Sequence, residues 1–497
     1  MMPFKINLIN RILWRLVSIA CISSLWLAAC QPLPVATGAA PNPSTTPTPP
    51  SNPIPATTLP PTVTPFPMAV IPPQLLVKPG ELKGIKIHFW HPWTGDLANE
   101  VAAIANEFNA ANLWGIQVET NAPGGSLMLY EQVKQNLAES SLPEVIAAPI
   151  DQLQDWQSSN QVVVNLNDYI QSTQWGMQAT EIKDFQPVFW QQDQVDGVQL
   201  AIPAVRDAQV LFYNQSWANE MGFTTPPATP QDFEKQACTA LQANIRTQRV
   251  DKIGTGGWII DSDPLPMLSW FLAFNGQPIP TSDAQSYTFN SPPVQESISY
   301  LNGLFKKTCI WPGRLPTPYE YFTRRMALFY SGAVTDIPTQ TRLQQHLKSS
   351  DNWAVIPYPT LLDKPVVLMN GPSYAIFKSN PQKQLAAWLF IRWLTLPRYQ
   401  ARLVNTSGYL PVSQSAVDML QDYGRLNPQW NQALALIPLA YPAPNLASWR
   451  VASTILQDAG WQIFHQPPTP IPVPTILQQL DETIPQIVNG TPTSTNP

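Results

Sequence analysis

The sequence predicts an α/β protein with a parallel sheet, because short apolar runs alternate with helix-like segments along residues 85–147. From Leu97 to Phe108, apolar residues recur at spacings of four, three and four, which is one face of an amphipathic helix. A strand–helix–strand–helix–strand order gives parallel strands, whose ligands gather beyond their carboxyl ends. The segments are strand 85–90, helix 96–112, strand 115–120, helix 126–140 and strand 143–147.

The rest of the chain continues this mixture without a visible internal repeat. A strand-like passage at 198–214 is interrupted by Pro203, and the last part is mostly helical with repeated proline breaks. The other expected elements are helices near 231–243, 264–274, 292–307 and 381–394, and strands at 326–334, 353–359 and 366–378.

Residues 1–29 have the layout of a secretory signal peptide. Basic residues precede an apolar run that begins at Leu16 and ends at Ala29, and the last residues of the run are small. A run of about 14 residues is too short to span a bilayer comfortably. The step from Ala29 to Cys30 resembles the lipobox of bacterial lipoproteins, in which the cysteine is lipidated and becomes the first residue. The alternative is an ordinary signal peptide followed by a chance cysteine.

Residues 30–82 read as a Pro/Thr-rich tether. Sixteen prolines fall between Pro32 and Pro79, and no charged residue occurs between Arg15 and Lys78. Such a segment buries too little apolar surface to offset its ordering entropy. Signal peptide, lipidated cysteine and tether together predict a protein held at the outer face of the cell membrane by a lipid anchor.

Composition narrows the function of the remaining chain. Charged residues make up 12% and the net charge is −5, with no basic run, so we expect no nucleic-acid partner. The chain holds 18 tryptophans beside many neutral amides and hydroxyls. Much of this serves core packing, but aromatic faces beside neutral polar groups also suit an uncharged polyhydroxyl ligand.

Two cysteines remain after the leader, Cys238 and Cys309. Because an exported chain meets oxidising conditions, a disulfide between them is expected, and two buried free thiols are the alternative.

Nine segments in order resemble the family 1 extracellular solute-binding proteins of bacterial ABC sugar importers, the group that includes maltose-binding protein. Each segment is weak alone, but the series extends from residue 84 to about 465. The segments are HFWHPWTG, PEVIAAPIDQLQDW, AIPAVRDAQVLFYN, FLAFNGQ, YTFNSPPVQESISYLNGLF, RRMALFYSGAV, WAVIPYP, NGPSYAIFK and SGYLPV.

The resemblance implies a periplasmic-binding-protein-like fold of type II, with two α/β lobes, a hinge and a cleft between the lobes. It places the N-terminal lobe at 83–204 and 353–400, and the C-terminal lobe at 205–352 and 401–497. It also implies a monomer that binds a carbohydrate-like solute, such as a sugar, an oligosaccharide or a polyol phosphate, and delivers it to the permease subunits of an ABC transporter.

Candidate ligand-binding residues follow from strand ends and from the resemblance. Beyond the first strand, His91, Trp93 and Thr94 are placed at the cleft, with Trp93 as a stacking face. Asp151 and Gln152 follow the third strand, although an N-cap is the alternative for them. The candidates that the resemblance adds are Arg206 and Asp207 (or an interlobe salt bridge), Trp270 (or core), Asn370, Gly371, Ser373, Tyr374, Tyr409, Trp449 and Arg450.

An arginine in the cleft would allow an anionic group on the ligand. Two other functions were weighed against a transport binding protein. One is an anchored adhesin or sensor that binds glycans without transport. The other is an anchored glycosidase, which needs two placed carboxylates, but the few acidic residues form no recognisable acid/base motif. The four histidines are too scattered for a metal signature, so we expect no enzyme activity, no metal and no cofactor.

Overall fold

The computed structural model describes residues 72–139, 141–250, 255–260, 263–312, 315, 317–464, 471–488 and 490. All of them belong to one compact unit, residues 69–497. The expected signal peptide, the lipidation site Cys30 and the tether up to residue 71 lie outside the described residues. No described helix has the length and apolar character needed to cross a bilayer.

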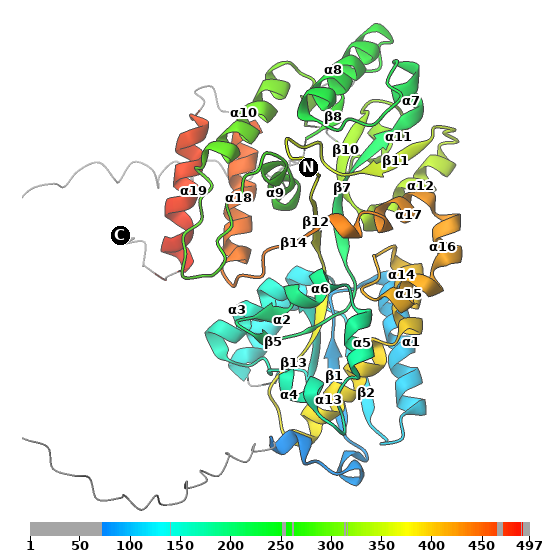
Figure 1. Cartoon of the computed structure of the whole chain (residues 1–497), viewed down its shortest axis with the longest axis vertical. Coiled ribbons are helices and arrows are strands. Elements are labelled where there is room, and N and C mark those ends of the chain that lie inside the picture. The colour runs from blue at the N-terminus through cyan, green and yellow to red at the C-terminus, as the bar shows by residue number, and fades with distance from the viewer. Residues whose placement is uncertain are drawn as a thin grey trace, which may run out of the picture. The chain divides into compact units, whose positions relative to one another are not determined.

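Helices account for most of the described elements (Figure 1). Those before the middle of the chain are α1 (Gly95–Ala111), α2 (Ser126–Glu139), α3 (Ile150–Asn160), α4 (Asn167–Gln171), α5 (Ala179–Asp184), α6 (Pro187–Gln192), α7 (Gln215–Glu220) and α8 (Pro230–Arg246). The later ones are α9 (Pro264–Ala273), α10 (Pro292–Lys306), α11 (Tyr319–Thr323), α12 (Ile337–His346), α13 (Pro381–Leu394), α14 (Pro397–Ser407), α15 (Gln414–Met419), α16 (Gln421–Leu426), α17 (Pro428–Leu434), α18 (Trp449–Phe464) and α19 (Val473–Val488).

The first sheet has five strands in the order β2-β1-β3-β13-β6. The parallel part, β1 with β2 and β3, is the one that the alternation of strands and helices predicted. β13 runs antiparallel to both β3 and β6. The strands are β1 (Lys86–Trp90), β2 (Gln117–Asn121), β3 (Val145–Pro149), β6 (Ile202–Pro203) and β13 (Pro372–Ile376).

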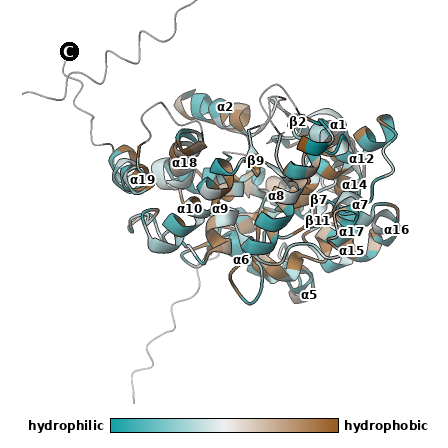
Figure 2. Ribbon diagram, turned by 90° about the horizontal axis from the view of Figure 1, so that it is seen from above, coloured by the Kyte–Doolittle hydropathy of each residue, from teal (hydrophilic) through white to brown (hydrophobic). Residues whose placement is uncertain are grey.

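Helices cover both faces of this sheet, because successive strand residues point to opposite sides. Phe89 lies in one buried cluster with residues of α1 and α13. Its neighbour Trp90 lies in another, with residues of α2 and α3. The expected face of α1 is buried, with Val101, Ile104 and Phe108 each 1% exposed or less. Seen in Figure 2, outer helices such as α2 and α8 carry hydrophilic and hydrophobic residues side by side.

The second sheet has seven strands, in the order β14-β12-β7-β10-β8-β9, with β11 also paired to β7. All eight residues of β7 are buried, as expected of a central strand. Helices α9, α10, α18 and α19 contribute to the core beside it. The strands are β7 (Asp207–Asn214), β8 (Trp258–Ile259), β9 (Ile310–Trp311), β10 (Phe329–Ala333), β11 (Trp353–Ile356), β12 (Val367–Asn370) and β14 (Ala440–Pro442). A small hairpin joins β4 (Gln194–Val195) and β5 (Val198–Gln199).

The chain passes from one sheet to the other between β6 and β7 and returns between β12 and β13. β11 and β12 pair with β7, so residues 353–370 belong to the second sheet, and only β13 joins the first. We therefore propose that the chain re-enters the first lobe at Gly371, instead of near Trp353. A Cβ atom at Gly371 would lie 2.4 Å from the carbonyl oxygen of Val205, so the two crossings approach too closely for a side chain.

The folded unit reaches into the segment expected as tether. Short 3₁₀ turns at η3 (Pro73–Leu75) and η4 (Pro79–Leu82) lie at its start. Val77 and Leu82 are 5% and 0% exposed and belong to the core that includes Phe89. We propose that the tether ends before Val77, because these side chains gain their burial from the first lobe.

Candidate functional site

A cavity of about 220 Å³ lies where the two lobes meet. Its lining comes from both lobes and includes Asn370 and Gly371 at the β12–β13 crossing. Side chains around it include neutral and acidic residues. The lining residues are Pro149, Ile150, Asp151, Gln192, Asp263, Pro264, Leu265, Asn370, Gly371, Ala443, Pro444, Trp449 and Ser453.

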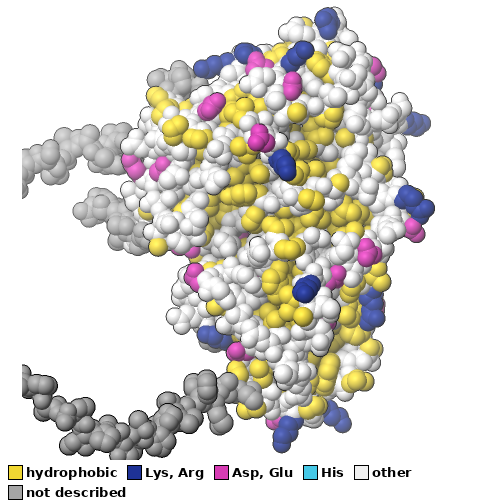
Figure 3. All heavy atoms as spheres, viewed as in Figure 1, with side chains coloured by type: hydrophobic (Ala, Val, Ile, Leu, Met, Phe, Trp, Pro, Cys, Tyr) yellow, Lys and Arg dark blue, Asp and Glu magenta, His cyan; other side chains and the backbone are white. Residues whose placement is uncertain are grey.

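Three helices begin at this cavity. α3 starts directly after β3, at the carboxyl edge of the parallel strands, where the sheet geometry predicts ligand binding. α9 and α18 start there from the second lobe, at Pro264 and Trp449. Figure 3 shows hydrophobic side chains gathered over the middle of the visible face, with few charged groups among them.

Asp151 is the acidic candidate that the structure places at the cavity. It lies in the first turn of α3. Burial raises the pKa of Asp151 to about 7. Hydrogen bonds from the backbone N–H groups of Asp151 and Gln152 oppose this rise, as does the charge of Arg450. Its predicted neighbour Gln152 is buried, with 8% of its surface exposed, and is not part of the lining.

The β12–β13 crossing brings Asn370 and Gly371 to the cavity, as the sequence predicted for this turn. The Oδ1 atom of Asn370 is buried and has no hydrogen-bond partner among the described residues. Ser373 and Tyr374 lie inside the first lobe instead. They are 0% and 1% exposed, and Ser373 Oγ accepts a hydrogen bond from Arg206 Nη2 at 3.1 Å.

Trp449 and Arg450 open α18, and they do different things. Trp449 lines the cavity and is 6% exposed. The guanidinium of Arg450 lies 4.4 Å from the ring centroid of Tyr130, a residue of α2 in the first lobe. Tyr130 in turn donates its hydroxyl hydrogen to Asp155 Oδ2 at 2.6 Å. Arg450 therefore makes a contact between the lobes.

Arg206 is completely buried and does not reach the cavity. Its side chain bonds Asp193 Oδ1 at 3.2 Å and also Gln192, Ser373 and two backbone carbonyls. Its backbone pairs with Leu410. Burial raises the pKa of Asp193 to about 6, and the charge of Arg206 opposes that rise. Arg206 thus ties together segments at the junction of the lobes, in line with the salt-bridge alternative.

Asp207 is held by the 3₁₀ turn η5 (Val334–Asp336), which follows β10. Its carboxylate accepts a hydrogen bond from Thr335 Oγ1 at 2.6 Å and one from the backbone N–H of Ala208. Burial raises the pKa of Asp207 to about 6, with these bonds opposing the rise. Asp207 does not line the cavity.

The candidates after β1 form a second group, away from the cavity lining. His91 and Trp93 are 1% and 4% exposed, with ring centroids 5.4 Å apart. Trp93 meets Tyr374 edge-on at 6.3 Å. Burial lowers the pKa of His91 to about 4, so it is neutral at pH 7. Thr94 is exposed, and it caps α1 without a side-chain hydrogen bond.

Tyr409 packs against a buried cluster that contains residues of both sheets, among them Phe89 and Phe212. Burial raises the pKa of its hydroxyl, and the nearby charge of Asp207 adds to that rise. Its carbonyl oxygen accepts a hydrogen bond from Trp430 Nε1 at 3.0 Å.

Trp270 lies in the core of the second lobe. It is 1% exposed and meets Phe233, Trp258 and Tyr358 edge-on. The structure gives it no face toward the cavity, so the core alternative describes its place.

Several lining residues were missed in the sequence. Asp263 and Pro264 carry a helix-start signal, an N-cap acid followed by proline at the first position. That signal marks the start of α9 but not that the start faces the other lobe. Gln192 and Ala443 carry no sequence signal of a site.

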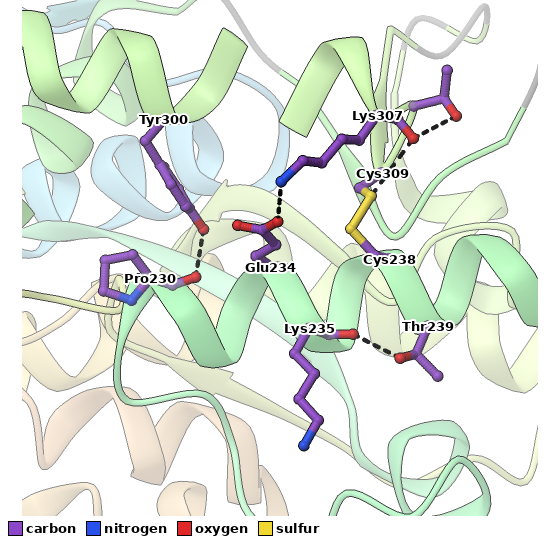
Figure 4. Close-up of a disulfide and its surroundings, with 9 residues drawn as sticks. Pro230, Glu234, Lys235, Cys238, Thr239, Tyr300, Lys307 and Cys309 are labelled. Carbon is purple, nitrogen blue, oxygen red and sulfur yellow. Dashed lines mark hydrogen bonds and ion pairs between the residues drawn. A yellow bond between two sulfur atoms is a disulfide. The ribbon is translucent and has the colours of Figure 1, made fainter. Parts of the chain in front are cut away.

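Cys238 of α8 and Cys309, next to β9, are joined by a disulfide (Figure 4). Lys307 pairs with Glu234 beside it, and Tyr300 donates a hydrogen bond to the carbonyl oxygen of Pro230. Within the described part of the chain, no group of three or more His, Cys, Asp or Glu residues could hold a metal ion.

Known proteins share this architecture. A curated relative, the sn-glycerol-3-phosphate-binding periplasmic protein UgpB of Pectobacterium atrosepticum, is 23% identical over 389 residues, which cover 70% of this chain and 78% of that protein. The sugar-binding protein MalE from Xanthomonas citri has a TM-score of 0.69 at 18% identity, over 82% of this chain and 98% of that one. UgpB from Mycobacterium tuberculosis, in complex with glycerophosphocholine, has a TM-score of 0.67 at 17% identity, over 82% and 99%.

The two solved structures, at these identities, support the two-lobed fold. A family model for bacterial extracellular solute-binding proteins matches residues 103–436, more than half of the chain. Members of this family are extracellular proteins that bind solutes and do not act as enzymes. The protein is therefore a binding protein that works outside the cytoplasm. The chain belongs to the family of bacterial extracellular solute-binding proteins.

Proposed function

We propose that this protein captures a carbohydrate-like solute reversibly and delivers it to the permease of an ABC transporter. The observation that carries the proposal is the cavity whose lining combines the start of α3 in the first lobe with the starts of α9 and α18 in the second. A solute held there touches both lobes at once. Binding energy then favours the closed arrangement of the lobes, which is how hinged binding proteins respond to ligand.

The chemistry of the lining supports a hydroxylated solute. Trp449 offers an aromatic surface, while Asp151 and the Oδ1 atom of Asn370 offer acceptors. Sugars combine apolar ring faces with hydroxyl donors, so they match this pairing. MalE from Xanthomonas citri is a sugar-binding protein, and UgpB of Pectobacterium atrosepticum binds sn-glycerol 3-phosphate. Both kinds of solute carry hydroxyl groups.

The mode of attachment extends the proposal. A lipid on Cys30 and the Pro-rich segment after it would keep the binding unit near its permease at the membrane surface. When the lobes close, one surface from each lobe would face the permease. The protein would do this as a monomer.

A thermal-shift screen against sugars, oligosaccharides, polyols and sn-glycerol 3-phosphate tests the capture step. We expect at least one hydroxylated solute to raise the melting temperature. The same solute should reduce the radius of gyration in small-angle scattering and be recovered unchanged. A solute that is returned chemically altered, or that binds without compaction, contradicts the proposal.

A further inference from the structure

We propose that the cavity selects hydroxylated solutes that carry no negative charge, and that Asp151 is the residue that sets this preference. The inference rests on the proposed function and narrows it, because it rejects the phosphorylated solutes that some relatives bind. Three observations on the described residues carry it.

The first observation concerns the helix starts that meet at the cavity. The N-terminus of a helix is an anion-binding site when its N–H groups are free. Here carboxylates of the chain lie at these helix starts. Asp263 Oδ1 accepts the N–H of Leu265 at 2.9 Å in α9. Asp151 lies in the first turn of α3 and lines the cavity, so a carboxylate is placed at that helix start as well.

The backbone N–H groups directly before α18 are also hydrogen-bonded to a carboxylate of the chain. The carboxylate of Asp283 accepts the N–H groups of Ala447 and Ser448, each at 3.0 Å, directly before Trp449. A phosphate would therefore find these donors taken and negative charges in their place.

The second observation concerns positive charge. Among the described residues that line the cavity, none is Lys, Arg or His. Two arginines lie near the cavity, and neither lines it. Arg206 is buried in its bonds to Asp193, Gln192 and Ser373, and Arg450 lies over the ring of Tyr130, from where its charge acts on Asp151. A phosphate dianion would lose its hydration without meeting a cationic side chain in the lining.

The third observation concerns the groups that still need a partner. The buried Oδ1 atom of Asn370 has no hydrogen-bond partner among the described residues, and it accepts hydrogen bonds but cannot donate them. Asp151, when ionised, is likewise only an acceptor. A hydroxyl or ammonium group can donate to both, whereas the doubly ionised phosphate group of sn-glycerol 3-phosphate has only acceptor oxygens.

The inference is tested by calorimetric titration of the full-length protein at pH 7.5, with inorganic phosphate and sn-glycerol 3-phosphate as the anionic probes. We expect the wild type to bind neither. We expect Asp151→Asn to bind both at least about tenfold more tightly than the wild type, because it removes a charge with little change of shape. Asp151→Ser serves as a second variant in case the first does not fold.

Asp96→Asn is the matched control. Asp96 also lies in the first turn of a helix, α1, but it is exposed and outside the cavity lining. Its variant should behave as the wild type. Binding of either probe to the wild type at micromolar concentration overturns the inference. So does a failure of both Asp151 variants to gain affinity for the probes, or an equal gain in the Asp96 variant.

The proposed function is judged separately, by compaction of the wild type with uncharged sugars. If no sugar binds, the proposed function is wrong. The titrations with anionic probes still test whether the cavity rejects negatively charged solutes. If an uncharged sugar compacts the protein and phosphate also binds, only the rule on charge fails.

Discussion

Among single residues, Asp151 links the site most directly to the stability of the fold. Burial raises the pKa of Asp151 to about 7 in the folded protein, from a usual value near 3.8. The unfolded chain therefore releases this proton at lower pH than the folded one. Between these two values the unfolded state binds fewer protons, so the contribution of Asp151 to stability falls as pH rises.

We predict that Asp151→Asn is as stable as the wild type near pH 4 and more stable above pH 7. Asn does not titrate, so the difference should reach about 1–2 kcal/mol, after allowance for the partial exposure of Asp151. Urea unfolding at several pH values measures it. A difference that stays constant with pH would show that Asp151 ionises freely in the folded protein.

A second prediction concerns Trp270, which the sequence offered as a stacking face. Because the side chain is 1% exposed among other aromatic rings, Trp270→Ala should lower the free energy of unfolding by about 3–5 kcal/mol. Ligand affinity of the folded fraction should stay the same. Trp461, on α18, is 55% exposed, so Trp461→Ala should cost much less. If the Trp270 variant lost ligand affinity without losing stability, Trp270 would be a ligand-binding residue after all.

Trp270 and Trp449 show why residue type alone could not define the site. Both are tryptophans on helices of the second lobe, and both are nearly buried. Trp270 packs among the aromatic rings of its lobe, whereas Trp449 faces the cavity. Which side of a helix meets the opposite lobe depends on contacts between distant segments, and these leave no local pattern. The turn at Asn370 was predicted because it resembles a glycine-rich cleft loop of the family.

At the scale of elements, the alternation of strands and helices in residues 85–147 was enough to predict the parallel part of the first sheet, because parallel strands need crossover helices. The place where the chain returns to this sheet was harder. β11, β12 and β13 are all short apolar strands, and the sequence does not say which of them pairs with β7. Pairing partners far apart in the chain decide this.

The crossing between β6 and β7 depends on Arg206, which is the third prediction. Its side chain joins Gln192 and Asp193, at the end of α6, to Ser373 on β13. Arg206→Met leaves Asp193 buried without its countercharge, so we expect a loss of about 3–5 kcal/mol in unfolding free energy. Chemical denaturation measures that loss.

The double variant Arg206→Met, Asp193→Asn separates charge from packing. Removing both charges should restore a large part of the stability, because buried ion pairs contribute little net stability over neutral groups. If the double variant is as unstable as Arg206→Met, the hydrogen bonds to Ser373 and the backbone carbonyls hold the crossing instead of the ion pair.

At the scale of the whole molecule, both lobes line the cavity. The N-terminal part of the sequence predicts that the chain is attached to the membrane by a lipid. Cys30 follows a short apolar run that ends in small residues. One fatty chain gives only marginal binding to a membrane, whereas two give stable anchoring, and a lipidated N-terminal cysteine carries at least two.

We predict that Cys30→Ser moves the protein from the membrane fraction to the soluble extracytoplasmic fraction. The matched control is Cys21→Ser, which changes a cysteine inside the same apolar run and should leave the protein in the membrane fraction. Mass spectrometry of the mature N-terminus should show the lipid on Cys30 in the wild type and in the Cys21 variant. If the Cys30 variant stays in the membrane fraction with an intact leader, residues 16–29 hold the protein there as an uncleaved anchor. Solute capture by the released Cys30 variant should match the wild type, because the described cavity lining begins at Pro149.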